Sequence, residues 1–244
     1  MKINILTIFP QMFQPLQESM IGRAREKGIL EINVVDIRDH TEDKHNRVDD
    51  APFGGGAGMV MQYQPIITAF RENDMGGRVI YMSPRGKKLT GELAREISCE
   101  PEITILCGHY EGVDQRALDE MEAEEISIGD YVVTGGELPA MILIDASARF
   151  IDGVLSSRES ALDESVYSGL LEYPQYTRPR SIDGREVPEI LLGGDHGAVD
   201  LWRFREALKI TRDNRPDMLE KFVKDRNFSK KEKAVLDELG IRHQ

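Results

Sequence analysis

The sequence predicts an α/β protein with a mainly parallel sheet, followed by a small all-helical domain. Over residues 1–151, short apolar segments rich in Ile and Val alternate with segments of helical periodicity, which is typical of a parallel sheet covered by helices. Beyond about residue 175 the patterns are helical. The 244 residues suffice for one large domain or two smaller ones, and we expect two.

Five segments of the first domain have the composition of buried strands, being short, apolar and bounded by turn residues. They are residues 2–9, 30–37, 78–82, 102–107 and 125–128. The segments between them have helical patterns and cover residues 11–27, 64–73, 90–98 and 112–121. Residues 135–151 are apolar on most faces, which predicts a helix buried in the core or in a subunit interface.

The pattern changes after about residue 152. Residues 157–175 have weak periodicity and predict a linker between a first domain, 1–156, and a second domain, 176–244. We expect helices in the second domain at 198–211, 215–226 and 229–239, the last with Ser229 as its N-cap.

Charge and cysteine content limit the classes of protein that fit. The net charge is −12, but residues 176–244 carry 15 Lys and Arg against 13 Asp and Glu, whereas residues 1–175 carry 16 against 30. Such a balance permits nucleic-acid binding only through local basic patches. Two cysteines without a CxxC spacing predict neither a disulfide framework nor a zinc site, which fits the cytoplasm. No apolar run approaches the roughly 20 residues that span a membrane.

Three glycine-containing loops follow predicted strands, at 83–86, 108–112 and 129–136. Ligands of open α/β sheets bind at the carboxyl ends of strands, and glycine lets the backbone approach them closely. Three such loops in succession favour a nucleoside-type cofactor, although each alone would fit a simple turn. Neither GxGxxG nor GxxxxGK[ST] occurs, which argues against a dinucleotide site and a P-loop. A fourth loop, 50–60, reads DAPFGGGAGMV and fits either a ligand-facing loop or a surface turn.

Eight segments of the chain resemble the TrmD family of bacterial tRNA (guanine-N1)-methyltransferases, of the SPOUT class. They are ILTIFPQMF at 5–13, VDDAPFGGGAGMVM at 48–61, SPRGKKL at 83–89, LCGHYEGVDQR at 106–116, SIGDYVVTGGELPAM at 127–141, ARFIDGVL at 148–155, SGLLEYPQYTRP at 168–179, and LLGGDH with LWRFREAL within 191–208. The resemblance therefore runs almost from end to end.

This resemblance implies a deep trefoil knot in the first domain, S-adenosylmethionine as methyl donor, and an obligate homodimer with active sites at the subunit interface. It also implies a tRNA substrate, methylated on N1 of the guanosine immediately 3′ of the anticodon, position 37. A Mg²⁺ requirement is compatible with the family, but the sequence locates no metal site. The residues that match the family's cofactor site are Tyr81, Met82, Ser83, Pro84, Gly108, Tyr110, Glu111, Gly112, Ser127, Ile128, Gly129, Asp130, Tyr131, Val132, Val133, Gly135, Gly136 and Pro139.

The chemistry of guanine predicts the catalytic groups. Keto guanine carries a proton on N1, so methylation needs a base there, and charge that develops on O6 needs a donor or a cation. The family's base is the Asp of a D-S-F-x-x-G-L-L motif, and residues 164–171 here read ESVYSGLL. Glu164 thus occupies the Asp position with Asp163 before it; either carboxylate can serve, and we favour Glu164. Arg149 matches the Arg that stabilises O6, and near a helix C-terminus it would also favour the helix dipole.

Contacts with RNA are expected in both domains. Asp50 and the glycine loop Gly54, Gly55 and Gly56 are expected to face the target guanine, and Arg178, Arg203 and Arg205 to contact phosphates. Two alternatives are an RNA-binding or cofactor-sensing module without catalysis, and a SPOUT enzyme that methylates the ribose 2′-OH. The linker carboxylate with Arg149 argues against the first, and the segments YPQYTRP and LWRFREAL argue against the second.

Overall fold

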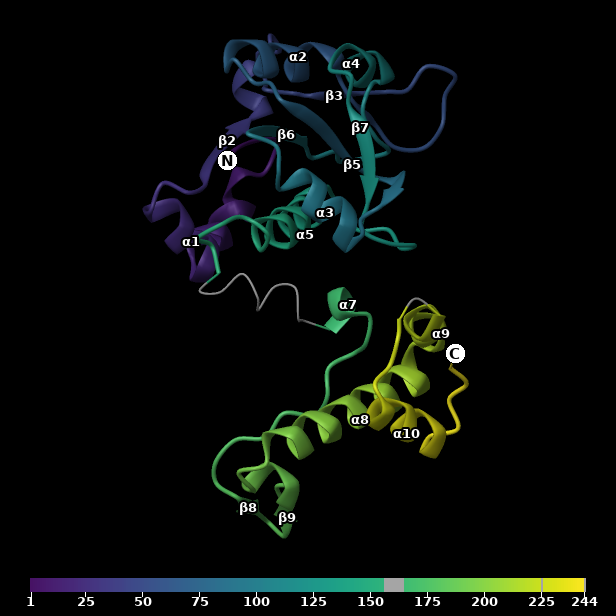
Figure 1. Cartoon of the computed structure of the whole chain (residues 1–244). Helices are drawn as coiled ribbons and strands as arrows, with labels where there is room; N and C mark the ends of the chain where they lie inside the picture. Colours follow the sequence, from purple (N-terminus) through teal and green to yellow (C-terminus); the bar gives the residue numbers. More distant parts are fainter. Residues whose placement is uncertain (156–164, 225, 244) are drawn as a thin grey trace. The chain divides into compact units, whose positions relative to one another are not determined.

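The computed structural model describes residues 1–155, 165–224 and 226–243, and the chain divides into two compact units, Met1–Arg158 and Glu159–Gln244 (Figure 1). Each unit has its own hydrophobic core. We describe each unit by itself.

The first unit is built on a five-stranded parallel sheet with the strand order β2-β1-β6-β5-β7. Its strands are β1 (Lys2–Thr7), β2 (Glu31–Asp36), β5 (Arg78–Lys88), β6 (Glu102–Leu106) and β7 (Glu124–Ser127). The five predicted strands are thus confirmed, because each apolar segment is buried in the sheet. The α/β class is confirmed with them.

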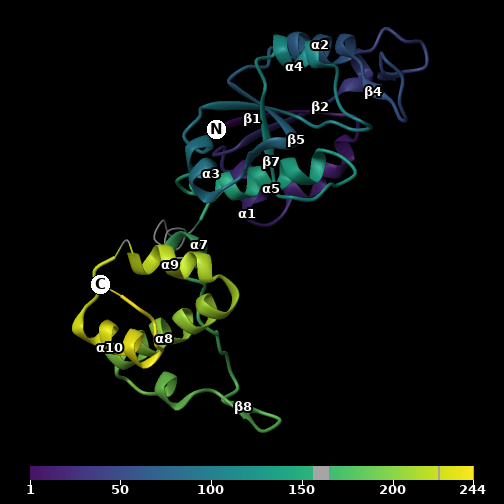
Figure 2. The same ribbon diagram turned by 90° about the vertical axis from the view of Figure 1, so that its right-hand side faces the viewer.

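Helices cover both faces of this sheet (Figures 1 and 2). One face carries α2 (Tyr63–Glu72) and α4 (Gln115–Glu120); the other carries α1 (Ser19–Glu26), α3 (Gly91–Ile97) and α5 (Glu137–Ala148). Successive strand residues enter the two cores alternately, as in β5, where Ile80 and Met82 face the α5 side and Val79 and Tyr81 the α2 side. Burial on both faces explains why the strands read as continuous apolar runs.

Two elements differ from the sequence prediction. The predicted helix 11–27 is a 3₁₀ helix, η1 (Pro10–Gln17), and a separate α1, since Pro15 interrupts the hydrogen bonding and Ser19 takes a left-handed φ of 56°. The predicted strand 78–82 continues to Lys88, because a register shift between Met82 and Lys87 keeps β5 paired with β7. Residues 83–86 therefore form a bulge within a strand, and not a strand-to-helix turn.

A short antiparallel pair, β3 (Asp49–Asp50) and β4 (Val60–Met61), holds the glycine-rich loop between its strands. The base of this loop is bonded to the loop after β6: the Glu111 N–H donates to the Met59 carbonyl at 3.0 Å, and the Met61 N–H donates to the Gly112 carbonyl at 2.9 Å. The loop 50–60 is thus attached to a second glycine-containing loop.

The second unit is mostly helical. It contains α7 (Ser165–Ser168), a small hairpin of β8 (Ser181–Ile182) and β9 (Arg185–Glu186), a 3₁₀ helix η3 (Glu189–Leu192), α8 (His196–Asn214), α9 (Pro216–Lys224) and α10 (Lys230–Glu238). The three predicted helices are confirmed, whereas the hairpin was not predicted. Ser229 caps α10 as expected: its Oγ accepts from the Glu232 N–H, and the Glu232 carboxylate accepts from the Ser229 N–H at 2.8 Å.

Part of the predicted linker packs into the core of this unit. Leu170 is buried there with Leu208, Phe222 and Leu236, and the Leu171 N–H donates to Thr211 Oγ1 at 2.8 Å. No helix among the described residues is both long and apolar enough to cross a membrane.

Candidate functional site

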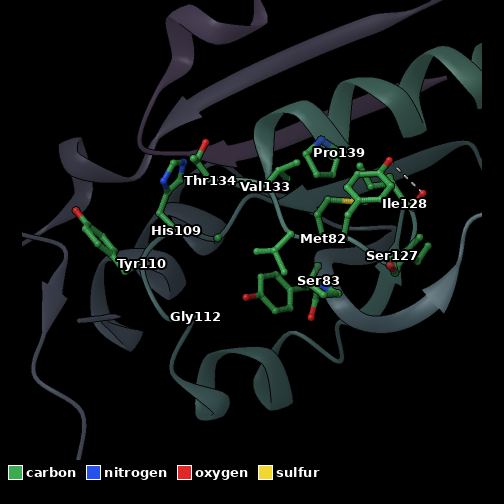
Figure 3. A pocket seen from close by; sticks show the side chains of 18 of the residues that line it. Met82, Ser83, His109, Tyr110, Gly112, Ser127, Ile128, Val133, Thr134 and Pro139 are labelled. Atoms are coloured by element: carbon green, nitrogen blue, oxygen red, sulfur yellow. Dashed lines mark hydrogen bonds between the residues drawn. The ribbon is translucent and has the colours of Figure 1, made fainter. Parts of the chain in front are cut away.

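A cavity of the first unit lies at the bulge of β5 and at the ends of β6 and β7 (Figure 3). Its volume of about 230 Å³ is many times the roughly 10–15 Å³ that one ordered water needs. The lining residues come from all three glycine-containing loops and from the start of α5: Tyr81, Met82, Ser83, Pro84, Gly108, His109, Tyr110, Glu111, Gly112, Ile126, Ser127, Ile128, Tyr131, Val132, Val133, Thr134, Gly135, Gly136 and Pro139.

Two glycines are required for the path of the chain around this cavity. The Gly136 N–H donates to the Gly108 carbonyl at 2.9 Å, so the chain that leaves β7 returns across β5 to the end of β6. A Cβ on Gly136 would lie 2.7 Å from the Cys107 Cα, and one on Gly108 would lie 2.8 Å from the Tyr81 ring. Only glycine permits these approaches. The crossing is the chain path that a trefoil knot requires, and the knot itself stays a prediction.

A buried carboxylate fixes one wall of the cavity. The Glu137 side chain is 1% exposed and lies in the first turn of α5, where a negative charge is favoured. Its Oε1 accepts from Thr7 Oγ1 at 2.6 Å, and its Oε2 lies 2.7 Å from His109 Nε2. Because a carboxylate only accepts, His109 donates this hydrogen bond. The pair connects the loop after β6 to the loop after β7.

The charge of the lining limits what the cavity can hold. Of the residues that line it, none is Lys or Arg, and Glu111 is acidic. A nucleotide phosphate would find no cationic partner here, whereas a neutral or positively charged nucleoside would meet backbone groups, hydroxyls and one carboxylate. Burial raises the pKa of Tyr81, with Glu125 adding to the effect, so this phenol stays a neutral hydrogen-bonding group.

Nearly all the residues predicted to bind a cofactor line this one cavity; the exceptions are Gly129 and Asp130. Gly129 has a φ of 151° beside the Tyr131 ring, and Asp130 forms an exposed ion pair with Lys88 at 2.7 Å. The sequence analysis did not include His109, Ile126 and Thr134, which also line the cavity. His109 stands between Gly108 and Tyr110, both predicted to bind a cofactor, so the sequence contains a signal for it.

The predicted catalytic residues are not all brought to the cavity. Arg149 is the C-cap of α5, whereas the cavity is at the N-terminal end of that helix. The 12 residues of α5 span roughly 18 Å at 1.5 Å per residue, so Arg149 cannot reach a ligand in the cavity of its own chain. Glu164 and Asp163 lie outside the described residues.

The residues predicted to contact RNA divide between the two units. Asp50 and the glycines 54–56 occupy the loop that is attached to the cavity loop 108–112. Arg178 and Arg203 line a separate cleft in the second unit, whereas Arg205 forms an ion pair with Glu238 of α10. Among the described residues, no group of three or more His, Cys, Asp or Glu is placed to hold a metal ion.

Fold and cavity together define an α/β protein with a cavity of uncharged and acidic lining at the carboxyl edge of a parallel sheet. The chain belongs to the tRNA (guanine-1)-methyltransferase family TrmD, of the SPOUT class, whose family model matches residues 1–221. The family assignment made from the eight segments is thereby confirmed.

Curated relatives agree with this assignment. The chain is 54% identical to a tRNA (guanine-N(1)-)-methyltransferase of Ruminiclostridium cellulolyticum, over 91% of this chain and 97% of the relative. It is 50% and 51% identical to proteins of the same name from Alkaliphilus oremlandii and Lactobacillus helveticus, each over 98% of both chains.

Proposed function

We propose that the protein transfers a methyl group from S-adenosylmethionine to N1 of the guanosine immediately 3′ of the tRNA anticodon, position 37. The observation that carries this proposal is the cavity at the bulge of β5 and the ends of β6 and β7, whose lining has no cationic side chain, in a chain that belongs to the tRNA (guanine-1)-methyltransferase family.

The cavity residues fit a sulfonium nucleoside. Ser83 and Ser127 offer hydroxyls, and Glu111 supplies a negative charge beside a ligand of positive charge. S-adenosylmethionine, when bound, supplies an electrophilic methyl group. Ile128, Val133 and Pro139 add apolar walls that exclude water from the reacting groups.

The chain's own residues handle the proton and the charge of the guanine. Glu164, with Asp163 as the alternative, accepts the N1 proton, and Arg149 donates to O6 where negative charge develops. Because the Glu side chain is one methylene longer than that of the family's Asp, the backbone at residue 164 must lie further from the guanine for the carboxylate to reach N1. Asp50 and Gly54, Gly55 and Gly56 then face the guanine, because their loop adjoins the cavity loop.

A homodimer follows from the position of Arg149 at the far end of α5. If Arg149 acts on a ligand in the cavity, it must act in the cavity of a second copy. The exposed side of α5 has the composition of an interface: Leu138 and Ile142, one turn apart, are 47% and 46% exposed. Phe9 and Met12, at the start of η1, are exposed as well.

The remaining expectations belong to the same proposal. The chain path from β7 to β6 forms a deep trefoil knot, and Arg178, Arg203 and Arg205 contact tRNA phosphates. The protein works in the cytoplasm, where its tRNA substrate is found. A Mg²⁺ requirement is compatible with the reaction, although the described residues offer no metal site.

The first experiment measures transfer of labelled methyl groups to unmodified tRNA transcripts that carry guanine or adenine at position 37. We expect transfer to the guanine transcript alone, and its loss in Glu164→Gln, with Asp163→Asn as the matched control. Loss of transfer in Asp163→Asn, with transfer retained in Glu164→Gln, would assign the general base to Asp163. If the wild type binds the cofactor but transfers no methyl group, the protein is a binding module and not an enzyme.

The homodimer is tested by complementation. Val133→Arg places a positive charge at a partly exposed residue of the cavity lining, against a cationic ligand, Arg149→Ala removes the cation, and we expect each variant to be inactive by itself. Co-expressed, they should recover about a quarter of the wild-type activity, because random pairing makes half of the dimers mixed and each mixed dimer holds one complete site. No recovery in dimers shown to be mixed would refute a site shared between copies.

A further inference from the structure

The second unit holds a cleft of about 590 Å³ that the cofactor chemistry does not use. One wall is the extended segment 173–180, a second is the end of η3, and the third is the first half of α8. The residues that line it are aromatic, aliphatic or basic: Tyr173, Pro174, Gln175, Tyr176, Thr177, Arg178, Arg180, Val187, Leu191, Leu192, Val199, Trp202 and Arg203.

Three aromatic rings meet in this cleft without stacking face to face. The centroids of Tyr173 and Tyr176 each lie 6.4 Å from that of Trp202, at interplanar angles of 65° and 53°. Tyr176 is 48% exposed, in contrast to Phe222 and Phe228, each 8% exposed in the core of the same unit. Tyr176 therefore keeps free surface for a flat ligand, whereas the rings of the core cluster do not.

The charged residues of the cleft are three arginines, without an acidic residue among its lining, in a chain of net charge −12. Two of them form exposed ion pairs with residues outside the lining: Arg180 lies 3.7 Å from Glu189 and Arg203 lies 3.6 Å from Asp200. Exposed ion pairs of this length contribute little to stability, so a phosphate can replace Glu189 or Asp200 as the partner of the arginine. Arg203 also lies over the Tyr173 ring, with its Cζ 5.0 Å from the centroid, which orients the guanidinium at the cleft.

We propose that this cleft binds one unpaired nucleotide of the substrate RNA. Its base stacks on Tyr176, beside Trp202, and the flanking phosphates contact the arginines at 178, 180 and 203. Aromatic platforms beside a basic groove are the general means of holding single-stranded nucleic acid, and a base inside a duplex presents no free face to them. The inference rests on the proposed function for the identity of the partner as RNA, and adds which groups of the second unit read it.

Trp202 is the only tryptophan of the chain, so its fluorescence reports on the cleft directly. Titration of full-length protein with unmodified tRNA transcript is expected to quench this fluorescence; heparin, a polyanion without bases, is expected not to. Quenching by heparin equal to that by tRNA, or no quenching by tRNA that binds, would overturn the inference.

Variants separate stacking from charge. Tyr176→Ala should weaken tRNA binding by about 5- to 150-fold, which corresponds to the roughly 1–3 kcal/mol of one base–aromatic stack, and Tyr176→Phe should restore it. Arg180→Gln should lower the slope of log K against log salt by about 0.7, the value for one phosphate of a single strand. Lys230→Gln removes one positive charge outside the cleft and should leave the quenching unchanged. Unchanged affinity in Tyr176→Ala would refute base stacking.

Methyl transfer measured on the same samples distinguishes the two proposals. Quenching and Tyr176 dependence without methylation would refute the enzyme and leave the cleft as an RNA site. Methylation of position 37 without quenching, and with wild-type affinity in Tyr176→Ala, would support the proposed methyltransferase activity and refute the cleft as an RNA site.

Discussion

Replacement of His109 tests whether the buried pair with Glu137 holds the wall of the cofactor cavity. In His109→Ala, Glu137 Oε2 loses the donor at 2.7 Å and keeps only the Thr7 hydroxyl, on Oε1. Water cannot easily replace the donor, since the Glu137 side chain is 1% exposed. His109→Gln is the matched variant, because its amide retains a donor for the same oxygen.

The magnitude follows from the burial of the acceptor. A hydrogen bond to a charged group contributes about 1.5–3 kcal/mol, and loss of one partner leaves the buried oxygen without compensation. We expect His109→Ala to lose about 2–3 kcal/mol of stability. At roughly 2–4 °C per kcal/mol for a unit of this size, the melting temperature should fall by about 4–12 °C. His109→Gln should lose less than half as much.

Thermal unfolding followed by circular dichroism measures the first effect, and calorimetric titration with S-adenosylmethionine measures the second. Cofactor affinity should fall in His109→Ala, because the ring lines the cavity and ties loop 108–112 to α5. A melting temperature within about 1 °C of wild type, equivalent to about 0.3 kcal/mol, would refute the reasoning. Equal losses in the Ala and Gln variants would show that packing, and not the hydrogen bond, is responsible.

Three further predictions use other parts of the fold. Gly136→Ala should destabilise the first unit by more than about 2 kcal/mol in thermal unfolding and weaken cofactor binding, since its Cβ would lie 2.7 Å from backbone. Gly76→Ala is the control: its Cβ would have nothing within 4 Å, so its stability in the same assay should equal that of the wild type. Burial raises the pKa of the Cys107 thiol well above its usual value, with Glu137 adding to the effect, so alkylation near pH 8.5 should label only the exposed Cys99. Labelling of both thiols in folded protein would contradict this. Because the unfolded thiol ionises at a lower pH than the folded one, the stability that the neutral thiol contributes is complete below the unfolded pKa and is lost as pH rises from that value through the folded pKa. Ser229→Ala should cost about 1 kcal/mol in the second unit by loss of the cap of α10, and an unchanged urea midpoint would count against it.

Most of the fold was predictable because its signals are local. Each strand of the sheet is a run of apolar residues, and burial on both faces makes such runs unambiguous. The two failures in the first unit depend on contacts between distant segments. The strand β5 continues to Lys88 only because β7 pairs with it again after the bulge, and α1 begins only after Ser19 adopts a left-handed conformation. The residues of one segment determine neither its register against a distant strand nor the angle at which a following helical turn begins.

The convergence of the predicted cofactor residues on one cavity was predictable to a similar degree, because carboxyl ends of parallel strands meet at one edge; that the cavity binds a cofactor stays a prediction. What the sequence could not predict is the pairing of His109 with Glu137, 28 residues later, since it depends on the return of the chain from β7 to β6. The sequence could not predict the distance of Arg149 from the cavity either, because it depends on the direction in which α5 runs. The family resemblance supplied the residues, and the position of Arg149 at the far end of α5 supports the proposed homodimer.

The division of charge between the two units explains how an acidic protein can use both a cationic cofactor and an anionic RNA. The cofactor cavity has no Lys or Arg in its lining, so it does not repel a sulfonium and offers no partner to phosphate. The cleft of the second unit has the opposite composition, with three arginines and no acid. A single basic surface over both would attract RNA into the cofactor cavity and disfavour the methyl donor. Because the two sites have opposite local charge, the net charge of −12 predicts neither partner, whereas the side chains within each site predict both.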